Sequence, residues 1–326
     1  MRKTALGLTV ATIGLAAFTF GAAAADVVRL AGTYTVSSAL PYFVAAKNGY
    51  FEAENLDVQQ VNVASSALGV QALIAGEADG VANLVSLEAA NINGRLPGTV
   101  AYFAMFGQNA EYRMEQFIVR ADYPGDTLES LKGANLFVST GPANAAAAKA
   151  ALASVGLAID TDYKFSELPI PQHVGALAAK TFDGGYTLEP AATIAVNQGI
   201  AKRIEAGVIA TRILGDEKAM AWAAGTGFAP SFVEANPDVA RRFANAWRKA
   251  LADIEADAPG VRDLLVEHMN TPADIAPDMV ILIAKMVKDM SEAEISQFQA
   301  FIDFGVEAGV VPAVVDVKDF LVSLGD

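Results

Sequence analysis

The chain has 326 residues, of which 53% are hydrophobic and 18% are charged, and its formal net charge is −14. This length and apolar content predict one large or two ordinary globular domains. The negative balance argues against a nucleic-acid partner, because the field of such a protein repels phosphates. The sequence has no cysteine and two histidines, which excludes disulfides, thiolate catalysis and a histidine-rich metal site. We expect no cofactor.

The N-terminus has the pattern of an export signal. Arg2 and Lys3 precede an apolar run at 6–20, and three alanines ending at Ala25 precede Asp26. This pattern is typical of a secretory signal peptide cleaved after Ala25. An uncleaved membrane anchor is the weaker alternative, because the apolar run is short for a span. Cleavage removes two positive charges from the formal −14 and leaves −16. We therefore expect a soluble protein in the periplasm.

The first predicted strand, at 26–30, feeds a polar loop and a helix that Gly49 ends. Thr33 and Tyr34 crowd the carboxyl end of this strand, and Ser38 is the expected N-cap of the helix. Hydroxyl groups at such a junction are typical of the sites where open α/β sheets bind small molecules. Many such junctions bind nothing, so the prediction depends on the recurrence of the pattern.

The pattern does recur along the chain. Ser65 and Ser66 precede a predicted helix, and Asn83 and Ser86 follow at the end of a predicted strand at 80–84. A second set of strands and helices begins after residue 125. Its predicted strand at 135–139 ends in Ser139 and is followed by the tight loop 140–142 and an alanine-rich helix at 143–155. Beyond residue 219 the pattern is mostly helical, with helices predicted at 279–286, 292–304 and 317–324.

Strands that alternate with helices predict the α/β class with parallel sheets, here in two lobes with a ligand cleft between them. The expected division is a signal peptide at 1–25, a discontinuous first lobe at 26–119 plus 220–326 with the C-terminal helices, and a second lobe at 120–219. The inter-lobe crossings are expected at 120–123 and 214–219.

Four segments then resemble a known family. The segment 40–52 (LPYFVAAKNGYFE) resembles the first helix of periplasmic substrate-binding proteins of ABC importers, in the subgroup that binds sulfonates, taurine, nitrate and pyrimidine precursors. Segment 72–79 resembles the end of the second helix, 138–142 stands at the loop of the second lobe, and 183–190 is similar to the strand that ends in Glu-Pro. The resemblance covers about 27–255. It implies a type II periplasmic-binding fold with two crossover strands that closes on a small-molecule ligand, and an inner-membrane ABC permease with its ATPase as partner.

Carried over position by position, the resemblance implies a set of ligand-binding candidates and no catalytic or metal-binding residue. The candidates are Thr33, Tyr34, Ser38, Ser65, Ser66, Asn83, Ser86, Ser139, Thr140, Asn144, Tyr186 and Glu189. The sequence departs from the family at 143–144, where the family often has Ser-His, and at 102–116. The cysteine-rich motif of the pyrimidine-precursor synthases is absent. These departures leave the ligand open.

Hydroxyls, amides and two tyrosine rings predict a small organic anion, a sulfonate or carboxylate with a short apolar part, held by neutral donors and helix N-termini. Arg113 is the only basic candidate nearby. If Glu189 faces the cleft, a pyrimidine-like nitrogen compound fits better. An enzyme on the same fold needs an acid–base pair, for which only Glu189 and His173 are available. We expect a binding protein rather than an enzyme or a sensory domain of a transcription regulator.

Overall fold

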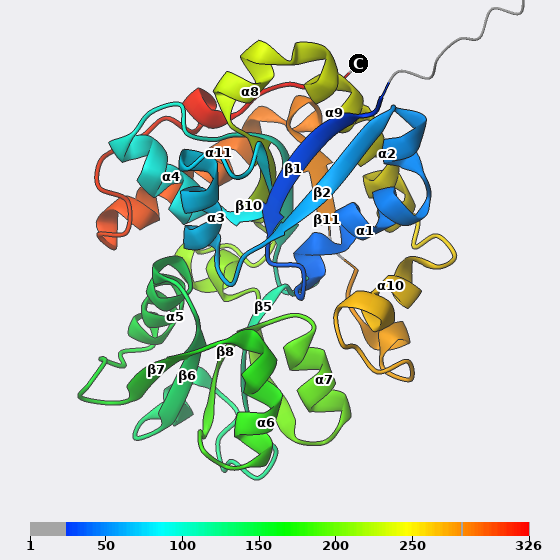
Figure 1. Ribbon diagram of the computed structural model, residues 1–326. Helices are drawn as coiled ribbons and strands as arrows, with labels where there is room; N and C mark the ends of the chain where they lie inside the picture. Colours follow the sequence, from blue (N-terminus) through cyan, green and yellow to red (C-terminus); the bar gives the residue numbers. More distant parts are fainter. Residues whose placement is uncertain (1–23, 282, 326) are drawn as a thin grey trace, which may run out of the picture.

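The computed structural model describes residues 24–281 and 283–325. It contains two lobes, one above the other, each built on its own sheet with helices around it (Figure 1). Residues 1–23 of the predicted signal peptide lie outside the described residues. None of the described helices is long and apolar enough to span a bilayer.

The first lobe contains a six-stranded mixed sheet in the order β11-β4-β10-β3-β1-β2. Its strands are β1 Asp26–Gly32, β2 Leu56–Asn62, β3 Gly80–Val85, β4 Ala101–Gln108, β10 Ala221–Phe228 and β11 Ile283–Met286. β1 pairs in parallel with β2 and β3, whereas β10 runs antiparallel to β3 and β4. The surrounding helices are α1 Leu40–Lys47, α2 Tyr50–Ala53, α3 Ser66–Ile74, α4 Ser86–Arg95, α8 Pro230–Ala235, α9 Pro237–Glu255, α10 Val261–His268 and α11 Glu292–Glu307.

The second lobe contains a five-stranded sheet in the order β7-β6-β8-β5-β9. Its strands are β5 Glu115–Arg120, β6 Asn135–Ser139, β7 Lys164–Leu168, β8 Gly184–Leu188 and β9 Ala201–Ala206, and its helices are α5 Pro142–Ser154, α6 His173–Ala178 and α7 Ala191–Asn197. β6 pairs in parallel with β7 and β8, and β5 is antiparallel to β8 and β9. The predicted α/β class and the two-lobed architecture are confirmed.

The core of the first lobe shows why these elements pack as they do. Phe243, Trp247 and Leu251 lie at helical spacing on α9 and are all buried, which fixes this helix against the sheet. The Phe243 and Trp247 rings stack with centroids 5.4 Å apart. Gly49 ends α1 with a φ of +68°, a conformation that side chains with a Cβ rarely adopt. Packing therefore holds α1 at the edge of the cleft, and Gly49 determines where this helix ends.

Four sequence predictions about elements are wrong. The predicted helix at 317–324 is only a 3-10 turn at Val317–Phe320. β5 pairs with β8 and β9, so residues 115–119, which the sequence pattern placed in the first lobe, lie in the second sheet. The predicted helix at 279–286 instead contains strand β11, because β4 needs a partner on its open edge. Ser38 does not cap α1: the N-cap is Ala39, and Ser38 lies in the 3-10 turn Ser37–Ala39.

The chain crosses between the lobes twice, from Gln108 to Glu115 and from Ala206 to Ala221. The expected first crossing at 120–123 is at the wrong end of β5, where Ala121 N donates to Ile200 O within the second lobe. The expected return at 214–219 falls inside the second crossing. The two crossings also contact each other, because Glu115 Oε1 accepts from Ile209 N at 3.1 Å. They form a paired hinge beside the cleft.

Candidate functional site

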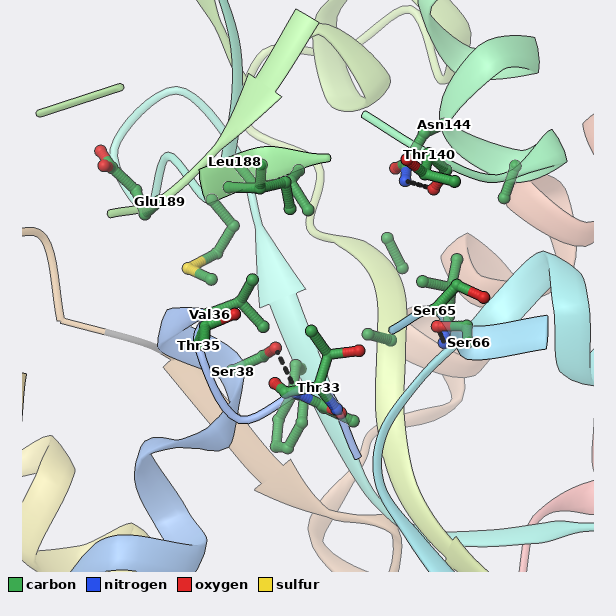
Figure 2. Close-up of a pocket in the computed structure, with 18 of the residues that line it drawn as sticks. Thr33, Thr35, Val36, Ser38, Ser65, Ser66, Thr140, Asn144, Leu188 and Glu189 are labelled. Carbon is green, nitrogen blue, oxygen red and sulfur yellow. Dashed lines mark hydrogen bonds between the residues drawn. The ribbon is translucent and has the colours of Figure 1, made fainter. Parts of the chain in front are cut away.

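A cavity of about 490 Å³ lies between the two lobes and is lined by residues of both. Its first-lobe wall comes from the loops that follow β1 and β2, and its second-lobe wall comes from the start of α5 and the end of β8 (Figure 2). The lobes also touch outside the cavity: Ser37 N donates to Glu189 O at 3.4 Å, and Asn197 Nδ2 donates to Asp278 Oδ2 at 2.6 Å. The structure is therefore in a closed arrangement.

Ten of the twelve predicted site residues line this cavity. They are Thr33, Tyr34, Ser38, Ser65, Ser66, Asn83, Thr140, Asn144, Tyr186 and Glu189. Ser86 and Ser139 do not line it, because both side chains are fully buried and hydrogen-bonded inside their lobes. Ser86 Oγ donates to Trp222 O at 2.8 Å, and Ser139 Oγ donates to Tyr186 O at 3.3 Å. A contact between the ten and a ligand remains a prediction.

Three serines of the first-lobe wall share one hydrogen-bonding pattern. Ser38 Oγ accepts from Asn83 Nδ2 at 3.2 Å, Ser65 Oγ accepts from Leu68 N at 3.4 Å, and Ser66 Oγ accepts from Val85 N at 3.3 Å. Toward the other described residues, none of the three donates. A hydroxyl has one hydrogen to donate, so each serine keeps that hydrogen for a group in the cavity. We call Ser38, Ser65 and Ser66 the donor hydroxyls.

Asn83 fixes the loop that carries the first of these serines. Its Oδ1 accepts from Thr33 N at 3.1 Å, and its Nδ2 donates to Thr33 O at 2.9 Å as well as to Ser38. Thr33 Oγ1 in turn donates to Val63 O at 3.2 Å. The polar groups of Asn83 and Thr33 are therefore used in hydrogen bonds that hold the first-lobe wall in its shape.

Tyr34 presents its ring to the cavity rather than a free hydroxyl. Tyr34 OH donates to Leu30 O at 2.7 Å, and its ring meets those of Tyr42 and Phe43 edge to face. Tyr186, the other predicted tyrosine, is 1% exposed. Burial raises the pKa of both phenols well above the ordinary value, so both stay neutral. The contribution of Tyr34 to the site is therefore apolar surface.

Glu189 lines the cavity with its backbone side, while its carboxylate turns into the second lobe. The carboxylate accepts from Gln116 Nε2 at 2.8 Å, from Thr193 Oγ1 at 2.7 Å and from Thr193 N at 3.0 Å. Figure 2 shows it pointing away from the other labelled residues. Gln116 also accepts from Arg203 Nε, which places a guanidinium behind the carboxylate. The carboxylate of Glu189 therefore does not face the cleft, which was the condition under which a pyrimidine-like nitrogen compound would fit better.

His173 is a core residue. Its Nε2 lies 2.8 Å from Leu168 O, which can only accept, so Nε2 carries the hydrogen and Nδ1 accepts from Thr187 Oγ1 at 2.7 Å. Burial lowers the pKa of His173 to about 4, so the ring is neutral. In the part of the chain that the structure describes, His173 and Glu189 share no hydrogen bond, and no acid–base pair forms between them.

Sequence reasoning missed the polar lining residues Thr35, Asn62 and Gln108, and also Glu88, which does not line the cavity itself. Glu88 lies in the first turn of α4 in the first lobe, and its Oε1 accepts from Ala143 N, at the start of α5 in the second lobe, at 3.4 Å. Its other oxygen, Oε2, is buried and has no hydrogen-bond partner among the described residues. Burial raises the pKa of Glu88 to about 7. The helix N-terminus that we expected to bind an anion is thus already occupied.

Much of the remaining lining is apolar, which the sequence did not indicate. Examples are Val36, Met114, Ile170, Leu188 and Phe301, from five different elements or loops. Phe301 on α11 is 2% exposed and also borders the cavity. Among the described residues, no lysine or arginine lines the cavity, and this includes Arg113. Nor do three His, Asp or Glu side chains within 24–281 and 283–325 gather where they could hold a metal ion.

The comparisons with known proteins agree with this architecture. The alkanesulfonate-binding protein SsuA from Xanthomonas axonopodis pv. citri, bound to MOPS, matches with a TM-score of 0.73 at 17% identity, covering 93% of this chain and 100% of that one. The nitrate-binding protein NrtA from Synechocystis PCC 6803 matches with a TM-score of 0.68 at 17% identity, covering 90% and 84%. The desulfurization enzyme DSZB matches with a TM-score of 0.66 at 14% identity, covering 90% and 96%.

A search of curated proteins by sequence finds no match. At these identities the solved structures show a shared fold: two lobes of the periplasmic-binding type, on which both binding proteins and an enzyme are built. A family model, however, matches residues 24–269, which is well over half of the chain. The chain therefore belongs to the NMT1-like family.

Proposed function

We propose that this protein is the soluble substrate-binding component of an ABC importer. It captures a small organic anion between its lobes in the periplasm and delivers it to a membrane permease and its ATPase. The observation that carries the proposal is the cavity itself, which is closed by contacts between two lobes that only two chain crossings join. Such a hinge lets the lobes separate to admit and release a ligand. The predicted signal peptide and the periplasmic proteins of similar fold support the location.

The donor hydroxyls support the anion. Each already accepts an N–H, so each offers its hydrogen to the ligand, and three donors on one wall match the oxygens of a carboxylate or sulfonate. The apolar lining supports a short hydrocarbon body on the same molecule. The carboxylate of Glu189 faces away, so it does not oppose this charge. The two similar binding proteins are named for alkanesulfonates and for nitrate, which are also anions.

Native mass spectrometry of the purified protein, followed by titration calorimetry with the compound found, tests the proposal. We expect a bound alkanesulfonate or carboxylate that the protein does not consume. Calorimetry with a panel of short sulfonates, short carboxylates and neutral pyrimidines provides the comparison if no compound is retained. Binding of pyrimidines alone contradicts the anion, and turnover of the bound compound contradicts the role as a binding protein.

A further inference from the structure

Glu88 joins the starts of two helices that belong to different lobes. α4 begins at Ser86 in the first lobe and α5 begins at Pro142 in the second, and the carboxyl group of Glu88 lies between them. Gly141 precedes α5 beside this contact: a Cβ built there would lie 3.4 Å from Glu88 Oε1, an ordinary van der Waals distance, and its φ of +118° disfavours other residues. The carboxyl group of Glu88 therefore packs against a backbone position that favours glycine.

The environment of Glu88 is unusual for an acid. The side chain is 8% exposed, and Oε2 has no hydrogen-bond partner within the described residues. Its charge acts on the phenol of Tyr102 on β4, which stays neutral and donates to Leu84 O at 2.9 Å. A buried carboxyl group without a cation costs free energy, so its presence needs a reason. The helix N-terminus supplies part of the compensation, because its N–H groups favour negative charge.

Resting on the function proposed above, we infer that Glu88 is a specificity-determining residue: its carboxyl group takes the anion site at the start of α5, so the closed cavity accepts one anionic group and rejects a second. The first-lobe wall binds the single anionic group through the donor hydroxyls. A second anionic group would have to bind near Thr140 and Asn144 on the facing wall (Figure 2). Glu88 does not line the cavity itself, but its carboxyl group lies behind this wall, where it accepts from the N–H of Ala143 next to Asn144. Above its raised pKa of about 7 this group is ionised, and two like charges at short range inside a closed lobe interface repel strongly.

A pair of ligands that differ in one charge tests this inference. Titration calorimetry compares propanesulfonate with the matching propane disulfonate on the wild type, Glu88→Gln and Glu88→Ala. Glu88→Gln removes the charge and keeps an acceptor, whereas Glu88→Ala also empties the space. Glu307→Gln, on the exposed end of α11, is the matched control for the loss of one charge. At about pH 8, where Glu88 is ionised, we expect the wild type to prefer the monosulfonate by about tenfold or more, and Glu88→Gln and Glu88→Ala each to lose most of that preference. An unchanged ratio overturns the inference.

A second measurement needs no organic ligand, so it separates this inference from the ligand class. Inorganic sulfate is added to the isotope-labelled protein, and the amide signal of Ala143 is followed by NMR. We expect a saturable change of that signal in Glu88→Ala and none in the wild type or in Glu307→Gln. A missing change in Glu88→Ala shows that α5 offers no anion site, and the inference is then wrong. If neither sulfonate binds any variant, the proposed ligand class fails, and the sulfate result alone decides the role of Glu88.

Discussion

The two walls of the cavity differ in what they offer a ligand. On the first-lobe wall, three serines accept N–H groups of their own lobe and keep their hydrogens free. On the second-lobe wall, two of the polar groups are already satisfied: Glu189 by Thr193 and Gln116, and the start of α5 by Glu88. The difference indicates a division of labour, in which the first lobe recognises the charged end of the ligand and the second covers its body.

Removing donor hydroxyls from the first-lobe wall should have the largest effect on ligand affinity. The double variant Ser38→Ala/Ser66→Ala should weaken binding of the true ligand by about 4 kcal/mol, because hydrogen bonds to a charged group contribute about 1.5–3 kcal/mol each. Titration calorimetry measures the loss. Ser154→Ala, on the exposed end of α5, removes a hydroxyl outside the cavity and should leave the affinity unchanged. Equal affinities of the double variant and the wild type would refute the role of the first-lobe wall.

A fall in pH should destabilise the second lobe more than the first. The pKa of His173 falls from 6.5 in the unfolded chain to about 4 in the folded protein, so its stabilising effect is complete above pH 6.5 and is lost as the pH falls toward 4. The loss should reach about 3 kcal/mol near pH 4, since a tenfold change in proton affinity corresponds to about 1.4 kcal/mol. Urea unfolding across this range measures it, and hydrogen exchange locates it in the second lobe.

Replacing each histidine by glutamine tests the effect of acid, with His268 as the control for His173. His173→Gln should flatten the decline of stability between pH 6.5 and 4. His268→Gln, at the half-exposed ring that stacks on Phe43 in the first lobe, should keep the decline. If both variants follow the wild type, burial of His173 does not control the acid stability.

The second-lobe wall should show a smaller effect on affinity. Thr140 is exposed at the cavity and lies opposite the donor hydroxyls, so Thr140→Val should cost about 1 kcal/mol, as expected for one lost hydrogen bond. Calorimetry beside Thr181→Val, an exposed threonine outside the cavity, isolates the effect. A loss as large as that of the serine double variant would show that the two walls contribute equally.

The smallest expected effect is on the rate of association. The predicted cleavage after Ala25 would remove Arg2 and Lys3 and take the formal charge from −14 to −16, and a protein of this charge repels an anion at long range. Raising the salt from low to physiological concentration should increase the association rate of an anionic ligand a few-fold, because salt screens this repulsion. Stopped-flow fluorescence measures it. A rate that falls with salt would indicate a cationic ligand.

The sequence predicts many of the residues that line the cavity, and the direction of their polar groups only in part. Thr33, Ser65, Ser66 and Asn83 were found because polar residues at the carboxyl ends of strands are a local signal. The direction of Glu189 is not local, since it depends on Gln116, which is far away in the sequence. Glu88 has the ordinary appearance of an acid in a helix's first turn, and only the docking of the other lobe gives it a role. The sheet to which β5 belongs depends equally on distant partners.

The strand order of the first sheet also has a consequence for synthesis. β4 lies between β10 and β11, both of which follow the whole second lobe in the sequence. A growing chain therefore exposes the apolar segment AYFAMFGQ of β4 without a strand partner until residues 221–228 have emerged, whereas the strands of the second lobe are contiguous from 115 to 206. Pairings over such distances form slowly. Strand β4 should thus stay unpaired for most of the synthesis, and chaperones recognise exposed apolar segments of this kind.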